Sequence, residues 1–263
     1  MVHGEGGLAV SVVVPVHNER ESLARLHERL TDTLRREGRA YELLFVDDGS
    51  TDGSTEVLRE LAHGDPAVRV VVLARRFGQL AATLCGLARA RGESVVTMDA
   101  DLQHPPEAAP RLVAALAGGY DVVVALREGV GRPGIVPRAG RWLLRWLFGV
   151  KVPKDLSTFR AFSGSVARRL AACGAEAVLL GAEVCRVGVR IGYVPAQVGR
   201  RERGKGKYTQ PLKFAIWLRA VAAYGWLPWR ALLFPLTWCL PRAPGPGYEV
   251  RETVSVAEER TSG

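Results

Sequence analysis

The sequence predicts an α/β fold in which a mostly parallel sheet is covered by helices on both faces. Short runs rich in Val and Leu are apolar without polar alternation, as expected of strands that are buried on both faces of a sheet. Between them, apolar residues recur at helical spacing, so strands and helices alternate along the chain. The 263 residues, 48% of them hydrophobic, are enough for one main domain and a small appendage.

The alternation is regular through the first half of the chain. Four leucines at helical spacing mark the first helix, and the neighbouring strands are rich in β-branched residues. The expected elements are strand 9–16, helix 19–37, strand 41–47, helix 52–63, strand 68–73, helix 78–91, strand 94–98, helix 106–118 and strand 120–126.

The regular order ends at 127–141, a stretch rich in Gly, Pro and Arg that we interpret as a loop over the active site. A helix with Trp142 and Trp146 on one face is expected next, and residues 155–162 (DLSTFRAF) are not assigned to an element. The remaining expected elements are helix 163–174, a helix near 181–187 and strand 189–198.

We divide the chain into a main domain, 1–208, a membrane-interface part, 209–240, and a disordered tail, 241–263. The apolar segment 214–240 contains four of the six tryptophans, but arginines and prolines interrupt it before the roughly 20 apolar residues of a spanning helix accumulate. Such a segment suits helices lying in the membrane interface, and packing on the core or on another subunit is the alternative. The tail is Pro/Gly-rich and then charged, which indicates disorder.

Composition narrows the class of partner. Lys and Arg outnumber Asp and Glu by 36 to 27, and the resulting charge of +9 indicates a nucleic acid, a phosphorylated substrate or an anionic lipid. No signal peptide is apparent before the first strand, so we expect a cytoplasmic location. The cysteines lack C-x-x-C spacing, which favours buried thiols over disulfides or a zinc site; they are Cys85, Cys173, Cys185 and Cys239.

The strongest chemical signal is Asp99-Ala100-Asp101, directly after the predicted strand 94–98. Carboxylates at the carboxyl end of a parallel strand face the crevice where α/β sheets bind ligands. Two such aspartates can hold a hard divalent cation that bridges diphosphate oxygens, and Gln103 offers a further oxygen ligand. Because a lone D-x-D pattern is common in loops, its place after a buried strand carries the hypothesis.

Three other motifs also follow predicted strands: VPVHNE at 14–19, FVDDGSTD at 45–52 and ARRFG at 74–78. Asp48 can accept hydrogen bonds from a base or ribose, Gly49 permits a tight turn, and Ser50 or Thr51 can cap the next helix. A plain strand-to-helix turn explains DDGSTD equally well. The guanidinium of Arg75 or Arg76 can reach a phosphate, and a solvated surface pair is the alternative.

A series of cations lies in the Gly-rich loops of the second half of the chain. Flexible backbone there can fold cations over a phosphorylated substrate, with arginine suited to bidentate phosphate binding and lysine acting as a point charge. A solvated face is the ordinary alternative. The series consists of Arg127, Arg132, Arg138, Arg201, Arg203, Lys205 and Lys207.

Together the motifs resemble inverting glycosyltransferase family 2. VPVHNE, FVDDGSTD, ARRFG, MDADLQHPPE, DLSTFRAF and RRERGKGKY occur in the family's order over about residues 9–210. The pattern is similar to the branch of dolichyl-phosphate mannose synthase and bacterial polyprenyl-phosphate glycosyltransferases. The resemblance implies a Rossmann-like GT-A fold, Mg²⁺ or Mn²⁺ as cofactor, a nucleotide-sugar donor and a polyprenyl phosphate or other lipid-linked acceptor.

The resemblance also implies roles for individual positions. The nucleotide-binding candidates are Pro15, His17, Glu19, Val46, Asp48, Arg75, Asp99 and Ala100. The candidates for binding phosphates or the acceptor are Arg127, Arg132, Ser157, Arg201 and Lys207. The metal candidates are Asp99, Asp101 and Gln103, and the catalytic candidates are Asp101 and Asp155, the latter matching a carboxylate proposed as base.

The role of Asp155 depends on the acceptor. A lipid monophosphate, with a second pKa near about 6, is largely ionised at neutral pH and needs positioning more than deprotonation. Asp155 would then orient the acceptor or an arginine, whereas a hydroxyl acceptor would need it as general base.

Two departures from the family pattern stand out. His104 replaces the aspartate of DLQDPPE and would alter the charge beside the metal, although variation at the surface is the favoured interpretation. The branch often continues into two transmembrane helices, whereas this sequence has only WLPWRALLFPLTWCL, so we expect a peripheral or monotopic protein.

Our leading hypothesis is transfer of a hexose-type sugar from a UDP- or GDP-sugar to a polyprenyl phosphate at the cytoplasmic face of the membrane. A glycosyltransferase that acts on a hydroxyl of a specialised metabolite is the first alternative. A basic nucleic-acid-binding protein is a remote one, because no signature of a known nucleic-acid-binding fold is present. The sequence does not decide whether the protein forms a homo-oligomer.

Overall fold

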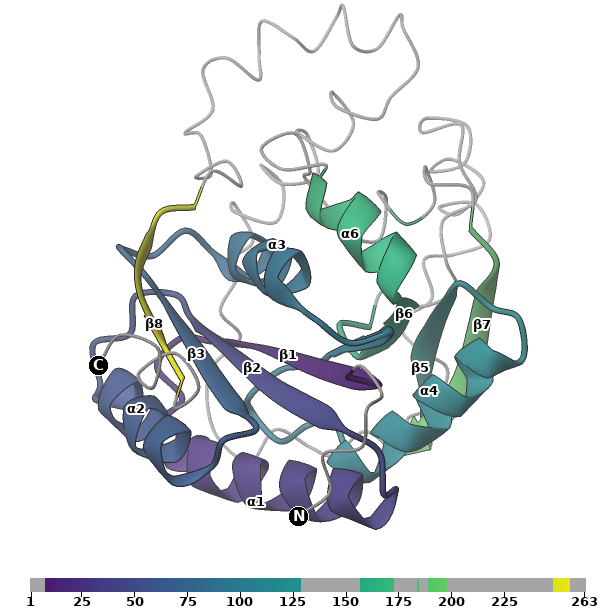
Figure 1. The fold of residues 1–263 in the computed structure, drawn as a ribbon, viewed down its shortest axis with the longest axis horizontal. Coiled ribbons are helices and arrows are strands. Elements are labelled where there is room, and N and C mark those ends of the chain that lie inside the picture. Colours follow the sequence, from purple (N-terminus) through teal and green to yellow (C-terminus); the bar gives the residue numbers. More distant parts are fainter. Residues whose placement is uncertain (1–7, 129–156, 173–183, 185–188, 198–247, 256–263) are drawn as a thin grey trace, which may run out of the picture.

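A computed structural model describes residues 8–128, 157–172, 184, 189–197 and 248–255. A central sheet runs through the domain, with α1 and α2 on one side of it and α3 and α6 on the other (Figure 1). The helices are α1 (Arg20–Arg36), α2 (Ser54–Gly64), α3 (Gln79–Arg89), the 3₁₀ turn η1 (Pro106–Ala108), α4 (Ala109–Ala117) and α6 (Gly164–Ala172). The predicted alternation of strands and helices over 9–126 is confirmed.

The sheet has eight strands in the order β7-β5-β6-β4-β1-β2-β3-β8. Its middle, β4-β1-β2-β3, is parallel throughout. The strands are β1 (Val10–Val16), β2 (Tyr41–Asp47), β3 (Val68–Leu73), β4 (Ser94–Thr97), β5 (Val122–Glu128), β6 (Arg160–Ser163), β7 (Ile191–Gln197) and β8 (Val250–Val254).

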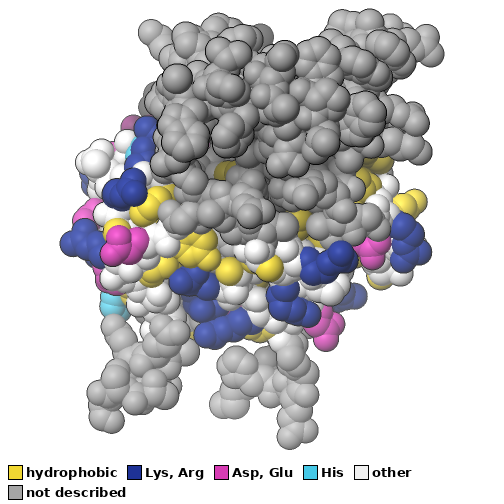
Figure 2. Space-filling view, turned by 90° about the horizontal axis from the view of Figure 1, so that it is seen from above, with side chains coloured by type: hydrophobic (Ala, Val, Ile, Leu, Met, Phe, Trp, Pro, Cys, Tyr) yellow, Lys and Arg dark blue, Asp and Glu magenta, His cyan; other side chains and the backbone are white. Residues whose placement is uncertain are grey.

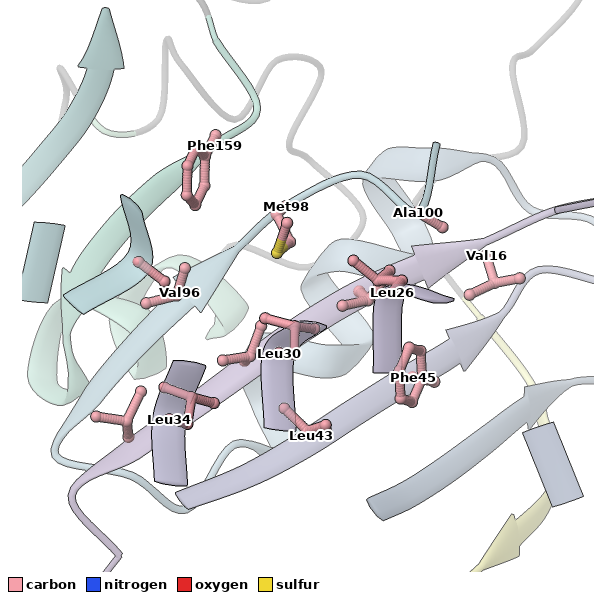
Figure 3. Packing of buried hydrophobic residues seen from close by; sticks show 14 of the residues in the cluster. Val16, Leu26, Leu30, Leu34, Leu43, Phe45, Val96, Met98, Ala100 and Phe159 are labelled. Atoms are coloured by element: carbon pink, nitrogen blue, oxygen red, sulfur yellow. The ribbon is translucent and has the colours of Figure 1, made fainter. Parts of the chain in front are cut away.

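The core is divided by the sheet into two apolar layers. Leu26, Leu30 and Leu34 of α1 point toward strand residues such as Leu43 and Phe45 (Figure 3). On the other face, α3 and α6 pack against the sheet and against each other. Burying one leucine contributes about 1.5–3 kcal/mol, so the leucine spacing that predicted α1 also fixes which side of it faces the sheet.

The strand β6 was not predicted. It lies between β4 and β5 and is antiparallel to both, so the sheet is mixed rather than continuously parallel. The strand has only four residues and includes Arg160, which is 5% exposed. A run this short with a charged residue has no readable period, which is why the sequence did not reveal it.

The expectation of a disordered tail over 241–263 is wrong for residues 248–255. Residues 250–254 form β8, an edge strand antiparallel to β3. Arg59 on α2 donates to the Glu252 carboxylate from Nε at 3.2 Å and from Nη2 at 2.6 Å. Just before β8, Glu249 O accepts a hydrogen bond from Ala74 N–H at 2.8 Å. Composition suggested disorder, but the V-R-E-T-V alternation fits a strand once an open sheet edge is available to pair with it.

Other predictions lie outside the described residues. These are the loop over most of 127–141, the helix with Trp142 and Trp146, the helix near 181–187 and the membrane-interface part, 209–240. Within the part of the chain that the structure describes, no helix combines the length and apolarity needed to cross a bilayer.

Cys85 is buried, as expected, and burial raises the pKa of its thiol to about 11.

A buried polar network joins the strands near their amino ends. Glu42 on β2 is 3% exposed and accepts hydrogen bonds from Ser11 Oγ at 2.5 Å and Arg69 Nη1 at 2.8 Å. The backbone N–H of Arg91, just before β4, donates to the same carboxylate at 2.7 Å. One carboxylate therefore connects β1, β2, β3 and the approach to β4.

We predict that Glu42→Ala destabilises the domain by about 3–5 kcal/mol, because it leaves the Arg69 guanidinium buried without its counter-charge. Denaturant unfolding monitored by circular dichroism measures this loss. Glu28→Ala, at an exposed position of α1, is the matched control and should change stability by less than about 0.5 kcal/mol. Equal effects of the two substitutions would contradict a structural role for the network.

Candidate active site

Four sequence motifs meet at one edge of the sheet. VPVHNE ends β1, FVDDGSTD ends β2, RRFGQ follows β3 and DADLQ follows β4. Because these four strands are parallel neighbours, their carboxyl ends lie side by side. The chain runs from β1 outward to β3 and then returns to β4 on the other side of β1. Such a reversal of strand order is where open α/β sheets bind ligands.

The loops after β1 and β2 are fastened to each other by reciprocal hydrogen bonds. Asn18 N–H donates to Ser50 Oγ at 3.0 Å, and Thr51 N–H donates to Asn18 Oδ1 at 2.8 Å. Asn18 adopts φ 56°, a left-handed conformation that asparagine tolerates better than most residues. The two motifs therefore form one unit at the edge of the sheet.

The predicted cap of the helix after β2 is wrong. Ser50 and Thr51 do not cap it but bind the loop after β1, as described above. The residue at the cap position of α2 is Gly53. Asp52, just before it, binds the first residues of two helices: its Oδ1 accepts from Ser54 N–H of α2 at 3.0 Å, and its Oδ2 accepts from Arg20 N–H of α1 at 3.2 Å. Burial would raise the pKa of Asp52, but these bonds and that from Ser54 Oγ outweigh it, so the pKa is lowered.

Asp48 is 3% exposed, and its carboxylate binds the loop after β3. Its Oδ1 accepts from Phe77 N–H at 2.6 Å, and its Oδ2 accepts from Gly78 N–H at 2.9 Å. Burial raises the pKa of the Asp48 carboxyl, and these backbone donors offset that only in part. The carboxylate predicted to bind a nucleoside is thus also a structural link between β2 and β3.

His17 is oriented by the backbone of Asp48. Its Nδ1 lies 2.9 Å from Asp48 O, and because a carbonyl oxygen only accepts, Nδ1 carries the proton. Pro15, in β1, and Glu19, in the loop after it, are both half-buried, and Glu19 N–H donates to Ser54 Oγ at 3.0 Å. The structure therefore brings the motif after β1 against the start of α2.

The side chains of Val46 and Ala100, two of the nucleotide-binding candidates, are buried in the core rather than exposed at the edge of the sheet. Val46 is 0% exposed within the core layer beside α3, and Ala100 is 3% exposed in the layer beside α1. Any contact of Val46 with a ligand would have to come from its backbone.

Arg75 and Arg76 are exposed beyond β3. The Arg75 guanidinium lies over the ring of Phe77, 4.2 Å from its centroid. A cation–π contact of this kind orients a guanidinium without neutralising it. Arg75 is consequently held at the same edge as the candidate aspartates, as a phosphate ligand would need to be.

Asp99 lies between two side chains that sequence reasoning missed. Gln79 Nε2, at the start of α3, donates to its Oδ1 at 2.6 Å, and Thr158 Oγ1, just before β6, donates to its Oδ2 at 2.8 Å. A single glutamine after ARRFG and a threonine in DLSTFRAF have no spacing that marks them as site residues. Their contact with Asp99 forms only because the fold brings the start of α3 and the segment before β6 together beside β4.

Asp101 and Gln103 lie in the turn after β4, and both are half-buried. Gln103 N–H donates to Asp101 Oδ1 at 3.2 Å, and Leu102 between them has φ 58°. Within the described residues, no group of three or more His, Cys, Asp and Glu side chains could enclose an ion. One or two carboxylates with an amide oxygen nevertheless fit Mg²⁺ or Mn²⁺ that is completed by substrate phosphates and water.

His104 is not a surface residue, which corrects the favoured interpretation from the sequence. It is 7% exposed, and its ring stacks on Phe159 with centroids 5.2 Å apart. The ring fills the space between the turn after β4 and the segment before β6.

The remaining candidates are described only in part. Asp155, Arg132, Arg201 and Lys207 lie outside the described residues. Arg127 is in β5 opposite Ala196 of β7, at the carboxyl end of the strand. Ser157 Oγ accepts from Phe159 N–H at 3.2 Å, and Ser157 precedes the threonine that binds Asp99. The structure thus brings the beginning of STFR to the aspartates, and within the described residues the cation series is represented by the backbone of Arg127 alone.

A parallel sheet with paired aspartates after its fourth strand, and an antiparallel strand beside them, defines the GT-A class of glycosyltransferase fold. The model of the family "Glycosyl transferase family 2" matches residues 11–172, and the chain belongs to this family. The family resemblance expected from the motifs and the GT-A fold are both confirmed.

Curated relatives are named undecaprenyl-phosphate 4-deoxy-4-formamido-L-arabinose transferase. The protein from Edwardsiella ictaluri is 38% identical over 205 residues, which cover 76% of this chain and 62% of the relative. The protein from Pseudomonas paraeruginosa is 52% identical over 120 residues, 45% of this chain and 35% of the relative. The matched part is thus less than two thirds of each relative.

Solved structures share the fold at lower identity. Glucosyl-3-phosphoglycerate synthase from Mycobacterium tuberculosis, in complex with Mg²⁺ and UDP, has a TM-score of 0.61 at 24% identity and covers 82% of this chain and 79% of its own. TarS from S. aureus, in complex with UDP-GlcNAc, has a TM-score of 0.54 at 19% identity and covers 82% and 66%.

Gly49 gives a test of how tightly the loops after β2 and β3 must approach. It has φ +64°, and a Cβ there would lie 2.6 Å from Arg76 N. We predict that Gly49→Ala lowers the free energy of unfolding more than Gly38→Ala does, because Gly38 has the same φ of +64° with nothing within 4 Å of a Cβ.

The left-handed conformation alone costs about 1–2 kcal/mol in each variant, and the clash with backbone adds about 1–3 kcal/mol in Gly49→Ala only. Thermal unfolding of both variants measures the difference. If the two lose equal stability, the close approach of the loops is not a constraint.

Proposed function

We propose that this protein transfers a sugar, with inversion, from a UDP- or GDP-sugar to a polyprenyl phosphate at the cytoplasmic surface of the membrane. The observation that carries the proposal is Asp99-Ala100-Asp101 at the carboxyl end of β4, next to the loops of β1, β2 and β3. Membership of glycosyltransferase family 2 supports the transferase chemistry. The names of the curated relatives, which specify undecaprenyl phosphate, support the acceptor class.

The donor would lie across the four loops. Pro15, His17, Glu19 and Asp48 would surround the nucleoside, with Arg75 near its phosphates. UDP in the structures of two GT-A neighbours, one of them with Mg²⁺, supports this arrangement. The exposed Arg75, held by Phe77, supplies the charge that a diphosphate requires.

Asp101, with Asp99 and Gln103, would hold a Mg²⁺ or Mn²⁺ ion. When bound, the ion neutralises charge that develops on the departing diphosphate. The protein's own part is to present these oxygen ligands in a fixed turn, and the Gln103 N–H bond to Asp101 serves this purpose. Arg127, whose backbone lies at the carboxyl end of β5, is a further candidate for binding phosphate.

On the acceptor side, an ionised lipid phosphate would attack the anomeric carbon in line with the leaving diphosphate. Such an oxygen is already a nucleophile at neutral pH, so Asp155 would orient the acceptor or a neighbouring arginine rather than remove a proton. Arg132, Ser157, Arg201 and Lys207 would bind phosphates, and the part at 209–240 would attach the protein to the membrane. Binding of these phosphates would offset the repulsion between two anionic substrates.

The net charge of +9 does not require a nucleic-acid partner. On the described part of the face in Figure 2, Lys and Arg side chains lie in separate groups among hydrophobic and acidic ones. Recognition of duplex DNA or RNA usually depends on a continuous basic face. Phosphorylated substrates and anionic lipid explain the charge more economically.

The donor base can be assigned by thermal shift. We predict that one of UDP, GDP, CDP and dTDP, with Mn²⁺, raises the melting temperature well above the others, because a ligand that binds only the folded state stabilises it. At about 100 times the Kd the stabilisation is about 2.7 kcal/mol. Repeating the panel with chelator is the control, and no shift with any nucleotide would contradict a nucleotide-sugar donor.

Asp101→Asn tests the metal assignment. We predict a loss of transfer of more than about 100-fold with little change in stability, because loss of a metal ligand removes several kcal/mol of charge stabilisation in the transition state. Asp32→Asn, at an exposed position of α1, should retain parental activity. Full activity of Asp101→Asn in the presence of chelator would exclude the metal role.

The product distinguishes a phosphate acceptor from a hydroxyl acceptor. We predict that labelled donor and short-chain polyprenyl phosphate give a product whose sugar is released by mild acid, as a glycosyl phosphodiester should be. Chromatography of the label before and after acid treatment measures this. A product stable to mild acid would favour transfer to a hydroxyl group, with Asp155 as general base.

A further inference from the structure

The carboxylate of Asp99 is held from two directions by neutral donors. Gln79 Nε2 reaches its Oδ1 at 2.6 Å from the first residue of α3. Thr158 Oγ1 reaches its Oδ2 at 2.8 Å from the segment before β6. With a described donor on each oxygen, rotation of the carboxylate about its last torsion angle is restrained.

Both donors are themselves anchored. Thr158 O accepts a hydrogen bond from the buried Thr97 Oγ1 on β4 at 2.8 Å. Gln79 follows Phe77 and Gly78, whose N–H groups bind the Asp48 carboxylate. Three consecutive residues, 77–79, therefore connect the aspartate after β2 to the aspartate after β4.

The amide of Gln79 and the hydroxyl of Thr158 orient the carboxylate and carry no positive charge themselves. A carboxylate offers about four lone-pair sites, and these two donors use two of them. Outer hydrogen-bond partners of this kind fix the geometry of metal-binding carboxylates, and their loss typically lowers metal affinity or activity by about 10- to 100-fold. An arginine or lysine in the same places would instead compete with a cation for the carboxylate.

We propose that Gln79 and Thr158 are positioning residues that set the orientation of Asp99 for binding a divalent cation with a nucleoside diphosphate. This inference rests on the proposed function. The bond from Gln79 also ties that orientation to the loop that binds Asp48, so the nucleoside and diphosphate parts of the site are held as one unit. Neither residue touches the reacting atoms in this role.

The test compares Gln79→Met and Thr158→Val, which keep approximate size and remove the donor, with Thr158→Ser, which keeps the hydroxyl. Titration calorimetry of the full chain measures binding of UDP, or of GDP if thermal shift selects it, at a series of Mn²⁺ concentrations. We expect the Mn²⁺ concentration for half-maximal binding to rise about 10- to 100-fold in Gln79→Met and Thr158→Val. Thr158→Ser should restore most of the loss.

Two controls separate positioning from folding. Thr253→Val, at an exposed position of β8, repeats the Thr-to-Val change away from the site and should leave Mn²⁺ dependence unchanged. The melting temperatures of all variants without ligand should agree within about 3 °C, a difference that corresponds to about 1 kcal/mol for a domain of this size.

Three results would overturn the inference, and they differ from one another. Parental Mn²⁺ dependence in Gln79→Met and Thr158→Val would refute positioning while leaving the proposed function intact. A large fall in melting temperature, with no rescue by Thr158→Ser, would show that the two side chains serve folding alone. Absence of any nucleoside diphosphate binding by the parent protein would remove the proposed function and the inference together.

Discussion

The register of the four parallel strands β4, β1, β2 and β3 is the constraint on which the rest of the structure depends. A slip of one residue in any pair would turn buried valines toward the wrong face and separate the loops that follow the strands. Two buried carboxylates, one in β2 and one directly after it, resist such a slip. Glu42 joins the strands near their amino ends, and Asp48 joins the loops after β2 and β3 at the carboxyl ends.

The two carboxylates differ in their roles: Glu42 serves the fold, whereas Asp48 also belongs to the candidate site. Glu42 is fully committed to Ser11, Arg69 and the backbone before β4, far along the strands from the candidate site. Asp48 both supports the loop at 77–78 and lies within the motif assigned to the nucleoside. The bonds from Phe77 and Gly78 restrain Asp48 and its loop. The position at which a nucleoside could contact this loop is therefore set by the fold.

Sequence reasoning succeeded where the physical signal is local. The leucines of α1 predicted both the helix and its buried side, and the apolar strands predicted the parallel centre of the sheet. The motifs after the strands predicted one shared edge, since carboxyl ends of parallel strands must meet. Sequence reasoning failed for β6, which is too short to show a period. It also failed for β8, because that strand pairs with β3 at the edge of the sheet, and the paired residues Leu73 and Val250 are 177 positions apart.

The sequence by itself determined the class of the fold and the family, and it selected the aspartates of the candidate site, because each depends on motifs of residues close together in the chain. Only the tertiary structure decided what those aspartates touch. Gln79 and Thr158 bind Asp99 from positions 20 and 59 residues away, and His104 is buried against Phe159 instead of facing solvent. Hydrogen bonds and packing between distant segments leave no periodic trace in a sequence, since they exist only once the strands have taken their order in the sheet.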